Sequence, residues 1–160
     1  MLTVIVDTRE KDPWTLRSSA IGERVVRKLD TGDYTIEGLE DVLCIERKKG
    51  PAELAGNFIE KRFKDVLKRI EQFPYKYLIV ECDVKDVVDY PVGSNIPKSR
   101  WKNIKIRGPL IMKFLSEIQV NYGVHVIFAG SAENAEYVAV NIMKRVHERE
   151  QDRYTDNEEE

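Results

Sequence analysis

Cysteine and histidine are scarce in this 160-residue sequence. The two cysteines, Cys44 and Cys82, each lie within a short apolar run, which indicates buried, reduced thiols and an intracellular protein. The two histidines, His125 and His147, have no metal-ligand spacing. A disulfide-stapled scaffold and a zinc site are therefore not expected.

Long apolar runs and a strong net charge are also missing. No apolar stretch approaches the twenty residues of a membrane-spanning helix, and Met1 is not followed by the pattern of a secretory signal. We therefore expect no association with a membrane. The 26 basic and 28 acidic residues give a net charge of −2, so the total charge points to no polyanionic partner. The length suits one domain with a substantial core and one active site.

Hydrophobic periodicity predicts strands first, then alternating helices and strands. Four apolar runs are expected to form a strand meander: Leu2 to Val6, Glu23 to Leu29, Asp33 to Ile36 and Val42 to Lys48. The remaining elements are a helix from Pro51 to before Pro74, a strand at 77–82, a polar loop at 83–108, a helix at 109–122, a strand at 124–129 and a final helix capped by Ser131. The predicted fold class is α/β, with a mixed central sheet flanked by helices.

The last residues differ in character from the rest. Residues 148–160 contain seven acids and two arginines, a net charge of −5, so residues 1–147 carry +3. We expect a folded, mildly basic domain at 1–147 followed by an acidic, disordered tail at 148–160.

Two carboxylates and a lysine are expected to meet on neighbouring strands. One predicted strand begins with Asp33 and the next ends in Glu46, Arg47 and Lys48, so a hairpin would bring Asp33 beside Glu46. Alternate side chains of a strand share a face, so Glu46 and Lys48 point together and Arg47 points away. Two carboxylates supply ligands for Mg²⁺, and an ammonium can stabilise a phosphorane-like transition state. This pattern indicates metal-assisted phosphodiester hydrolysis, although a solvent-facing strand of alternating charge has the same spacing.

Three motifs, in this order and spacing, resemble the nuclease domain of the XPF-type structure-specific endonucleases: Val6 to Glu10, Gly32 to Tyr34 and Ile45 to Lys49. The resemblance covers residues 1 to about 147. It implies a restriction-endonuclease-like core that cuts branched DNA, such as flaps and forks, with Mg²⁺ or Mn²⁺ as cofactor. A homodimer formed through this domain is a further hypothesis.

Matching the family position by position implies roles for the residues of these motifs. Asp7, Asp33 and Glu46 correspond to the acidic metal site, and Arg47 and Lys48 to catalytic residues beside it. Because strand alternation turns Arg47 away from the others, this arginine binds either an internal carboxylate or a phosphate.

Three additional site residues carry two interpretations each. The family signature ends in an aspartate six residues after its glutamate, where this chain has Ala52; Glu53 either takes over that role one residue later, or the role has been dropped. Arg9 is either a phosphate contact or a partner of Asp7. Arg62 either reaches the scissile phosphate or forms a structural ion pair.

A basic stretch offers a surface for DNA. The 27 residues between Asp89 and Glu117 contain no acid, and they are either a solvated face or a mobile loop that meets phosphates and stacks on a base. The candidate DNA-binding residues are Lys49, Lys98, Arg100, Trp101, Lys102, Lys105 and Arg107.

The leading hypothesis is therefore a metal-dependent, structure-selective DNA endonuclease. A junction resolvase or a nicking nuclease on the same core is an alternative, because the metal site does not encode DNA shape. A non-catalytic DNA-binding or scaffold subunit is a second alternative, which the alanine at position 52 keeps open.

Overall fold

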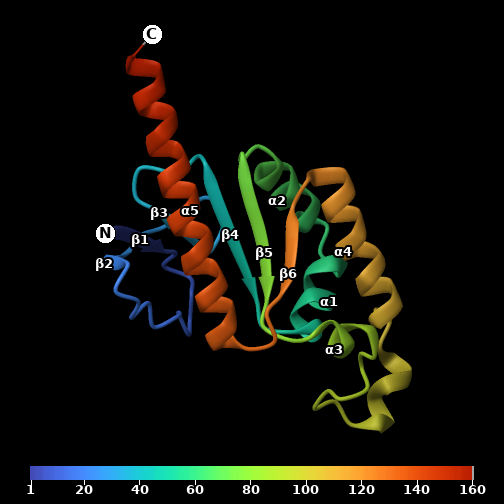
Figure 1. The fold of residues 1–160 in the computed structure, drawn as a ribbon. Helices are drawn as coiled ribbons and strands as arrows, with labels where there is room; N and C mark the ends of the chain where they lie inside the picture. Colours follow the sequence, from blue (N-terminus) through green and yellow to red (C-terminus); the bar gives the residue numbers. More distant parts are fainter. Residues whose placement is uncertain (160) are drawn as a thin grey trace.

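The structure is a computed structural model, described here for residues 1–159. Its centre is a six-stranded sheet in the order β2-β1-β3-β4-β5-β6 (Figure 1). Strand β3 is antiparallel to both of its neighbours, and the other strand pairs are parallel. The strands are β1 (Leu2–Val6), β2 (Ile21–Val26), β3 (Tyr34–Ile36), β4 (Leu43–Lys48), β5 (Tyr75–Val80) and β6 (His125–Phe128).

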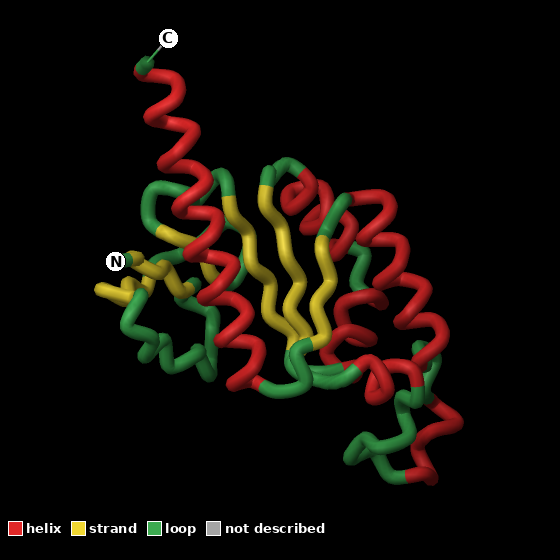
Figure 2. The backbone as a smooth tube through the Cα atoms, viewed as in Figure 1, coloured by secondary structure: helices red, strands yellow, loops and turns green. Residues whose placement is uncertain are grey.

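Helices cover both faces of this sheet, as Figure 2 shows. They are α1 (Pro51–Ile59), α2 (Arg62–Glu71), α3 (Val84–Val88), α4 (Gly108–Tyr122) and α5 (Ala132–Glu158), with a 3-10 helix, η1, at Lys98–Asn103. Helix α5 packs on one face and α1, α2, α3 and α4 pack on the other, each over its own apolar cluster. The predicted α/β class with a mixed sheet is confirmed.

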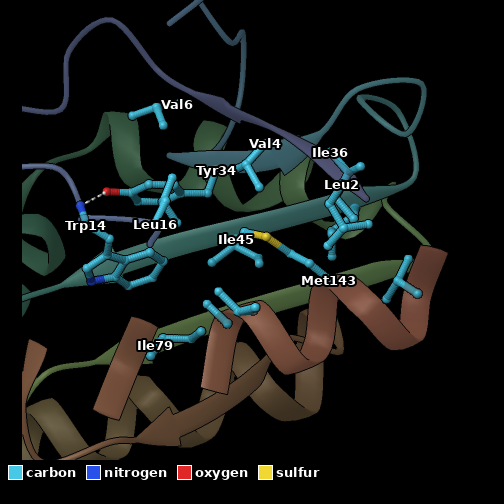
Figure 3. Packing of buried hydrophobic residues seen from close by; sticks show 14 of the residues in the cluster. Leu2, Val4, Val6, Trp14, Leu16, Tyr34, Ile36, Ile45, Ile79 and Met143 are labelled. Carbon is cyan, nitrogen blue, oxygen red and sulfur yellow. Dashed lines mark hydrogen bonds between the residues drawn. The ribbon is translucent and has the colours of Figure 1, made fainter. Parts of the chain in front are cut away.

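Alternation along β4 divides its residues between the two faces. Cys44 packs among α1, α2 and α4, whereas Ile45 packs against α5, where Met143 reaches toward it (Figure 3). On the α5 face, Trp14 stacks on Tyr34 with ring centroids 4.3 Å apart, and its backbone N–H donates to the Tyr34 hydroxyl. Glu46 therefore faces the α1 and α2 side, while Arg47 faces the α5 side.

The predicted meander is wrong at β2. In a meander β2 would lie between β1 and β3. Here β2 pairs in parallel with β1 at the sheet edge, and β3 pairs with the other side of β1. A parallel neighbour needs a crossover connection. Residues 7–20 provide one, because Trp14 and Leu16 in this segment are buried against the sheet.

The helix predicted from Pro51 to Pro74 is two helices. Helix α1 ends at Ile59 and α2 begins at Arg62, with a turn between them. Phe58 and Phe63 pack edge to face across this turn, with ring centroids 5.4 Å apart, so aromatic contact holds the corner. Two later helix boundaries agree with the sequence: Gly123 ends α4 in the left-handed conformation, and the Ser131 side chain caps the start of α5.

Helix α5 continues through Glu158, so residues 148–158 are helical where the sequence predicts disorder. Tyr75 of β5 donates a hydrogen bond to Glu150, and Arg145 and Arg153 pair with glutamates three residues away. Such pairs support an exposed helix beyond the packed core. Glu160, the last residue of the predicted tail, lies outside the described residues. Within residues 1–159, no helix combines the length and apolarity needed to cross a lipid bilayer.

Gly32 has a conformational role that no other residue type fills well. Its φ is +90°, and a Cβ built on it would lie 2.9 Å from Cys44 Sγ and 3.5 Å from the Ile45 carbonyl oxygen. This close approach brings the chain just before β3 against β4. The requirement for glycine beside Asp33 therefore has a packing reason as well as a backbone reason.

We expect Gly32→Ala to lower the free energy of unfolding by about 1–3 kcal/mol, because both strain and overlap oppose the methyl group. Gly56→Ala is the matched control. Gly56 lies in α1 with no atom within 4 Å of an added Cβ, so alanine should be neutral or stabilising there. Denaturant unfolding of both variants measures the difference, and equal effects would contradict this role for Gly32.

Candidate functional site

A cavity of about 490 Å³ lies where β1 ends and the β3–β4 pair meets α1 and α2. Its walls combine carboxylates, basic side chains and a few neutral groups. The residues that line it are Asp7, Arg9, Asp30, Thr31, Gly32, Asp33, Glu46, Lys48, Asn57, Glu60, Arg62, Phe63, Asp65, Val66 and Arg69.

Asp33 and Glu46 face each other across the β3–β4 pair. Tyr34 is the register partner of Ile45, and the Asp33 backbone N–H donates to the Ile45 carbonyl at 2.8 Å. The Asp33 carboxylate in turn accepts a 2.8 Å hydrogen bond from the Arg47 backbone N–H. The hairpin that the sequence predicts is thereby confirmed, and it fixes one carboxylate beside the other.

Burial makes two negative charges at this place unfavourable. It raises the pKa of Asp33 to about 8, and the charge of Glu46 adds to the increase. Burial also raises the pKa of Glu46, whereas the positive charge of Lys48 acts in the opposite direction. A divalent cation would favour the ionised form of both groups, since it competes with the proton for their oxygens.

Asp7 enters the same cavity but is held by other groups. One of its oxygens accepts from Arg9 Nε at 2.8 Å, and the other accepts from the Leu29 backbone N–H at 2.8 Å. Burial alone would raise the pKa of Asp7, but these hydrogen bonds outweigh it and the pKa is lowered. Arg9 was expected to be either a phosphate contact or a partner of Asp7, and in this structure it is the partner of Asp7.

The three acids predicted to hold a metal thus divide into a pair and a single residue. Asp33 and Glu46 lie together, while Asp7 is paired with Arg9. Among residues 1–159, no three acidic, histidine or cysteine side chains gather in the geometry of a metal site. The donors present are hard carboxylate oxygens, so the pair fits Mg²⁺ or Mn²⁺ rather than a softer metal.

Lys48 lies between two carboxylates. Its Nζ is 3.9 Å from Glu46 Oε2 and 3.7 Å from Glu53 Oε1. The second oxygen of Glu53 accepts from the Lys49 backbone N–H at 3.0 Å, which anchors the side chain at the start of α1. Glu53 therefore reaches the lysine in spite of Ala52, but it lines a neighbouring cavity and not the one that Asp33 and Glu46 line. Its role as a replacement for the missing aspartate stays a prediction.

Arg47 points to the opposite face of the sheet. Its side chain is 5% exposed, and its Nε donates to Glu81 at 2.9 Å while Nη1 donates to Glu10 at 3.2 Å. Arg47 was expected to bind either an internal carboxylate or a phosphate, and the structure shows it bound to internal carboxylates. Its contribution to the cavity is the backbone N–H that holds Asp33.

The partners of Arg47 were not identified from the sequence. Glu81 follows β5 and also accepts from the Trp14 indole N–H at 2.8 Å, and Glu10 accepts from the Tyr34 hydroxyl at 2.9 Å. The Arg47 guanidinium lies 5.2 Å from the centre of the Trp14 ring. A buried arginine needs acidic partners, so the inward direction predicted for Arg47 was the one signal in the sequence that such partners exist.

Arg62 reaches the cavity from the first turn of α2. Its side chain is largely exposed, and Nη2 lies 3.8 Å from Glu60. A weak surface ion pair of this kind leaves the guanidinium able to bind another anion.

The basic loop is more ordered than predicted and lies outside the cavity. It contains η1, and Trp101 donates its indole N–H to the Ile96 carbonyl at 2.9 Å while Lys98 lies over its ring. The loop projects beyond the end of the sheet where β5 ends (Figure 1). A second cavity of about 460 Å³ separates its 92–96 segment from residues 49–53. Its basic residues, namely Lys98, Arg100, Lys102, Lys105 and Arg107, are exposed, as is Lys49.

Comparison with known proteins decides the family. Residues 6–140 match the model of the ERCC4 domain. The chain belongs to the ERCC4 domain family. The XPF-type nuclease domain predicted from the three motifs is thereby confirmed.

Two solved structures share the fold of this ERCC4 domain. XPF from Aeropyrum pernix in complex with DNA has a TM-score of 0.67 and 18% identity, with 93% of this chain and 66% of that chain covered. XPF from Aeropyrum pernix has a TM-score of 0.62 and 18% identity, with 90% and 61% covered. The chain therefore spans slightly less than two thirds of either protein. No curated protein sequence matches the chain.

We expect Asp33→Asn to raise the melting temperature in metal-free buffer at pH 8, because it removes a buried carboxylate that repels Glu46. The folded-state pKa of Asp33, about 8, exceeds the ordinary value of 3.8. This group therefore stabilises the fold fully at low pH, and its contribution is lost as the pH rises toward 8. The wild type should lose more stability between pH 6 and pH 8 than the variant.

Thermal unfolding in the presence of a chelator at both pH values measures this effect. Asp30→Asn is the control, since Asp30 lines the same cavity but is exposed to solvent. An identical pH slope in wild type and Asp33→Asn would contradict the coupling between Asp33 and Glu46.

Proposed function

We propose that this domain is a metal-dependent DNA endonuclease that hydrolyses phosphodiester bonds in branched DNA such as flaps or forks. The observation that carries the proposal is the buried Asp33–Glu46 pair with Lys48 beside it, at one wall of an open cavity. Membership of the ERCC4 domain family supports the same reaction class.

The charge of the cavity supports a divalent cation. Six acidic and four basic side chains line it, so a cation of charge +2 would balance the fully ionised set. Asp33 and Glu46 would hold Mg²⁺ or Mn²⁺, and Asp7 would join them on release from Arg9. When bound, the cation would lower the pKa of a water ligand and stabilise negative charge on the phosphate.

The basic groups around the pair suit the substrate. The Lys48 ammonium is positioned by Glu46 and Glu53 and has donors to orient a water or to stabilise the charge that develops on phosphorus-bound oxygens. Arg9 and Arg62 at the rim are exposed and fit phosphates on either side of the scissile bond. The Arg47 network holds the two strands that present these groups, so Arg47 is a positioning residue in this proposal.

DNA is the proposed partner. The similar Aeropyrum pernix XPF structure is a complex with DNA, and this chain has an acid-free basic loop at the end of the sheet where β4 and β5 finish. A homodimer is part of the proposal as well, since α4 and α5 leave Val120 and Tyr137 largely exposed. These side chains would be covered by a second copy of the domain.

A non-catalytic DNA-binding subunit is the second candidate function. The ion pair between Asp7 and Arg9 favours it, because an acid engaged by arginine is not available to a metal. A junction resolvase or nicking nuclease would use the same residues and differ in the DNA shape that it accepts.

A cleavage panel tests the nuclease proposal. Flap, fork, four-way-junction and linear duplexes are incubated with Mg²⁺, Mn²⁺ or a chelator. We expect cation-dependent cleavage that is at least ~100-fold slower in Asp33→Asn and Lys48→Ala, with DNA binding retained. Lys144→Ala, on the helix that covers the opposite face, should cleave like the wild type. Full activity in both cavity variants would overturn the proposal, and DNA binding by an inactive wild type would favour the second function.

The loop generates a separate prediction. Charge reversal at Lys102 and Lys105 should weaken DNA binding and reduce the slope of log K against log salt by about 1 for each lost phosphate contact. The matched control reverses Arg24 and Lys28, which are exposed near the β2 edge on the far side of the sheet. An unchanged slope in the loop variant would exclude the loop from the DNA path.

A further inference from the structure

One side chain of the cavity has a hydrogen-bonding group that the protein leaves without a partner. Among residues 1–159, the Asn57 amide nitrogen Nδ2 is the single buried side-chain nitrogen or oxygen that makes no hydrogen bond. Asn57 lines the same cavity as Glu46 and Lys48. Buried donors are nearly always paired in folded proteins, so an unpaired donor at a cavity wall indicates a group that enters from outside.

The position of Asn57 on α1 fixes this donor in place. Asn57 lies one helical turn after Glu53, so the two side chains share a face of the helix. The Asn57 carbonyl accepts from the Glu60 backbone N–H at 3.1 Å, which ends the helix there. The next residue, Phe58, packs against Phe63 and Phe114. The amide is therefore held by a helix that is packed on its other side.

We propose that Asn57 contacts the substrate, donating a hydrogen bond from Nδ2 to a non-bridging oxygen of a DNA phosphodiester in this cavity. The inference rests on the proposed nuclease function and adds a residue to it. An amide is a neutral donor, so it binds an anionic oxygen without adding a charge that would compete with the cation for Asp33 and Glu46. Arg62 and Arg69 line the same cavity, where their guanidinium groups would bind the negative charge of the phosphate.

The carboxylates of the cavity do not satisfy this donor. Asp33 accepts from the Arg47 backbone, and Glu46 lies beside Lys48, while Nδ2 has no acceptor among the described residues. A phosphodiester offers acceptor oxygens and is the ligand class that a cation bound to these acids would attract. A buried water is the other occupant that could accept from Nδ2, and the experiment below separates the two.

The two occupants predict opposite effects of removing the amide. If Nδ2 has no partner in the free protein, its removal does not destabilise the fold but weakens the interaction with DNA. If an ordered water links it to the protein, its removal destabilises the fold and leaves cleavage unchanged.

The test uses Asn57→Ala and Asn57→Asp, with Asn57→Ser as the conservative variant that retains a donor. Asn121→Ala, an exposed asparagine of α4, is the matched control. Cleavage of the DNA that the wild type cuts best is measured in Mg²⁺ as kcat and KM, and thermal unfolding is measured on the same samples. We expect kcat/KM to fall roughly ten- to a hundredfold in the alanine and aspartate variants and less in the serine variant. The melting temperature of Asn57→Ala should equal or exceed that of the wild type.

Each outcome decides the matter. Wild-type kcat/KM in both Asn57→Ala and Asn57→Asp overturns the substrate contact and leaves the nuclease proposal intact. A lower melting temperature with unchanged cleavage assigns the amide to a buried water and also overturns the contact. If Asn57→Ala and Asn57→Asp are too unstable to assay, the folded fraction of Asn57→Ser decides: a kcat/KM below that of the wild type supports the contact, and full activity overturns it. A wild type that cuts no DNA overturns the nuclease proposal itself, together with this inference.

Discussion

The antiparallel pairing of β3 with β4 is the constraint on which the rest of the site depends. Gly32 lies so close to β4 that an added Cβ would come within 2.9 Å of Cys44 Sγ, and the backbone N–H of Arg47 holds the Asp33 carboxylate beside Glu46. Two buried carboxylates at this distance repel each other, and burial raises both pKa values. The fold thus maintains an arrangement that is unfavourable without a cation, which is typical of sites selected for function rather than for stability.

The side chains of β4 alternate between the cavity on one face of the sheet and a buried ionic network on the other. Glu46 and Lys48 face the cavity, and Glu53 approaches the lysine from the start of α1. Arg47 faces the α5 side and joins Glu81 and Glu10 in a buried ionic network. Removal of any one of these partners would destabilise the fold, because it leaves a buried charge unpaired. Three consecutive charged residues therefore serve the site in two different ways.

Local patterns predicted the elements whose signals lie within a few residues. Pro109, Gly123 and Ser131 mark helix boundaries through their own backbone or side-chain chemistry, and the structure has those boundaries. Three expectations failed where distant contacts decide. The position of β2 depends on how Trp14 and Leu16 pack against the sheet. The corner between α1 and α2 involves the contact of Phe58 with Phe114 of α4, and the extension of α5 includes the hydrogen bond from Tyr75 to Glu150.

The sequence by itself determined which motif residues share a face of β4, because residue spacing dictates side-chain direction in a strand. Tertiary structure decided how those residues are engaged. It paired Asp7 with Arg9, brought Glu53 to Lys48 and left the Asn57 amide without a partner. These relations arise between segments that are adjacent in space, where hydrogen-bond geometry and burial select among partners that the sequence leaves equivalent.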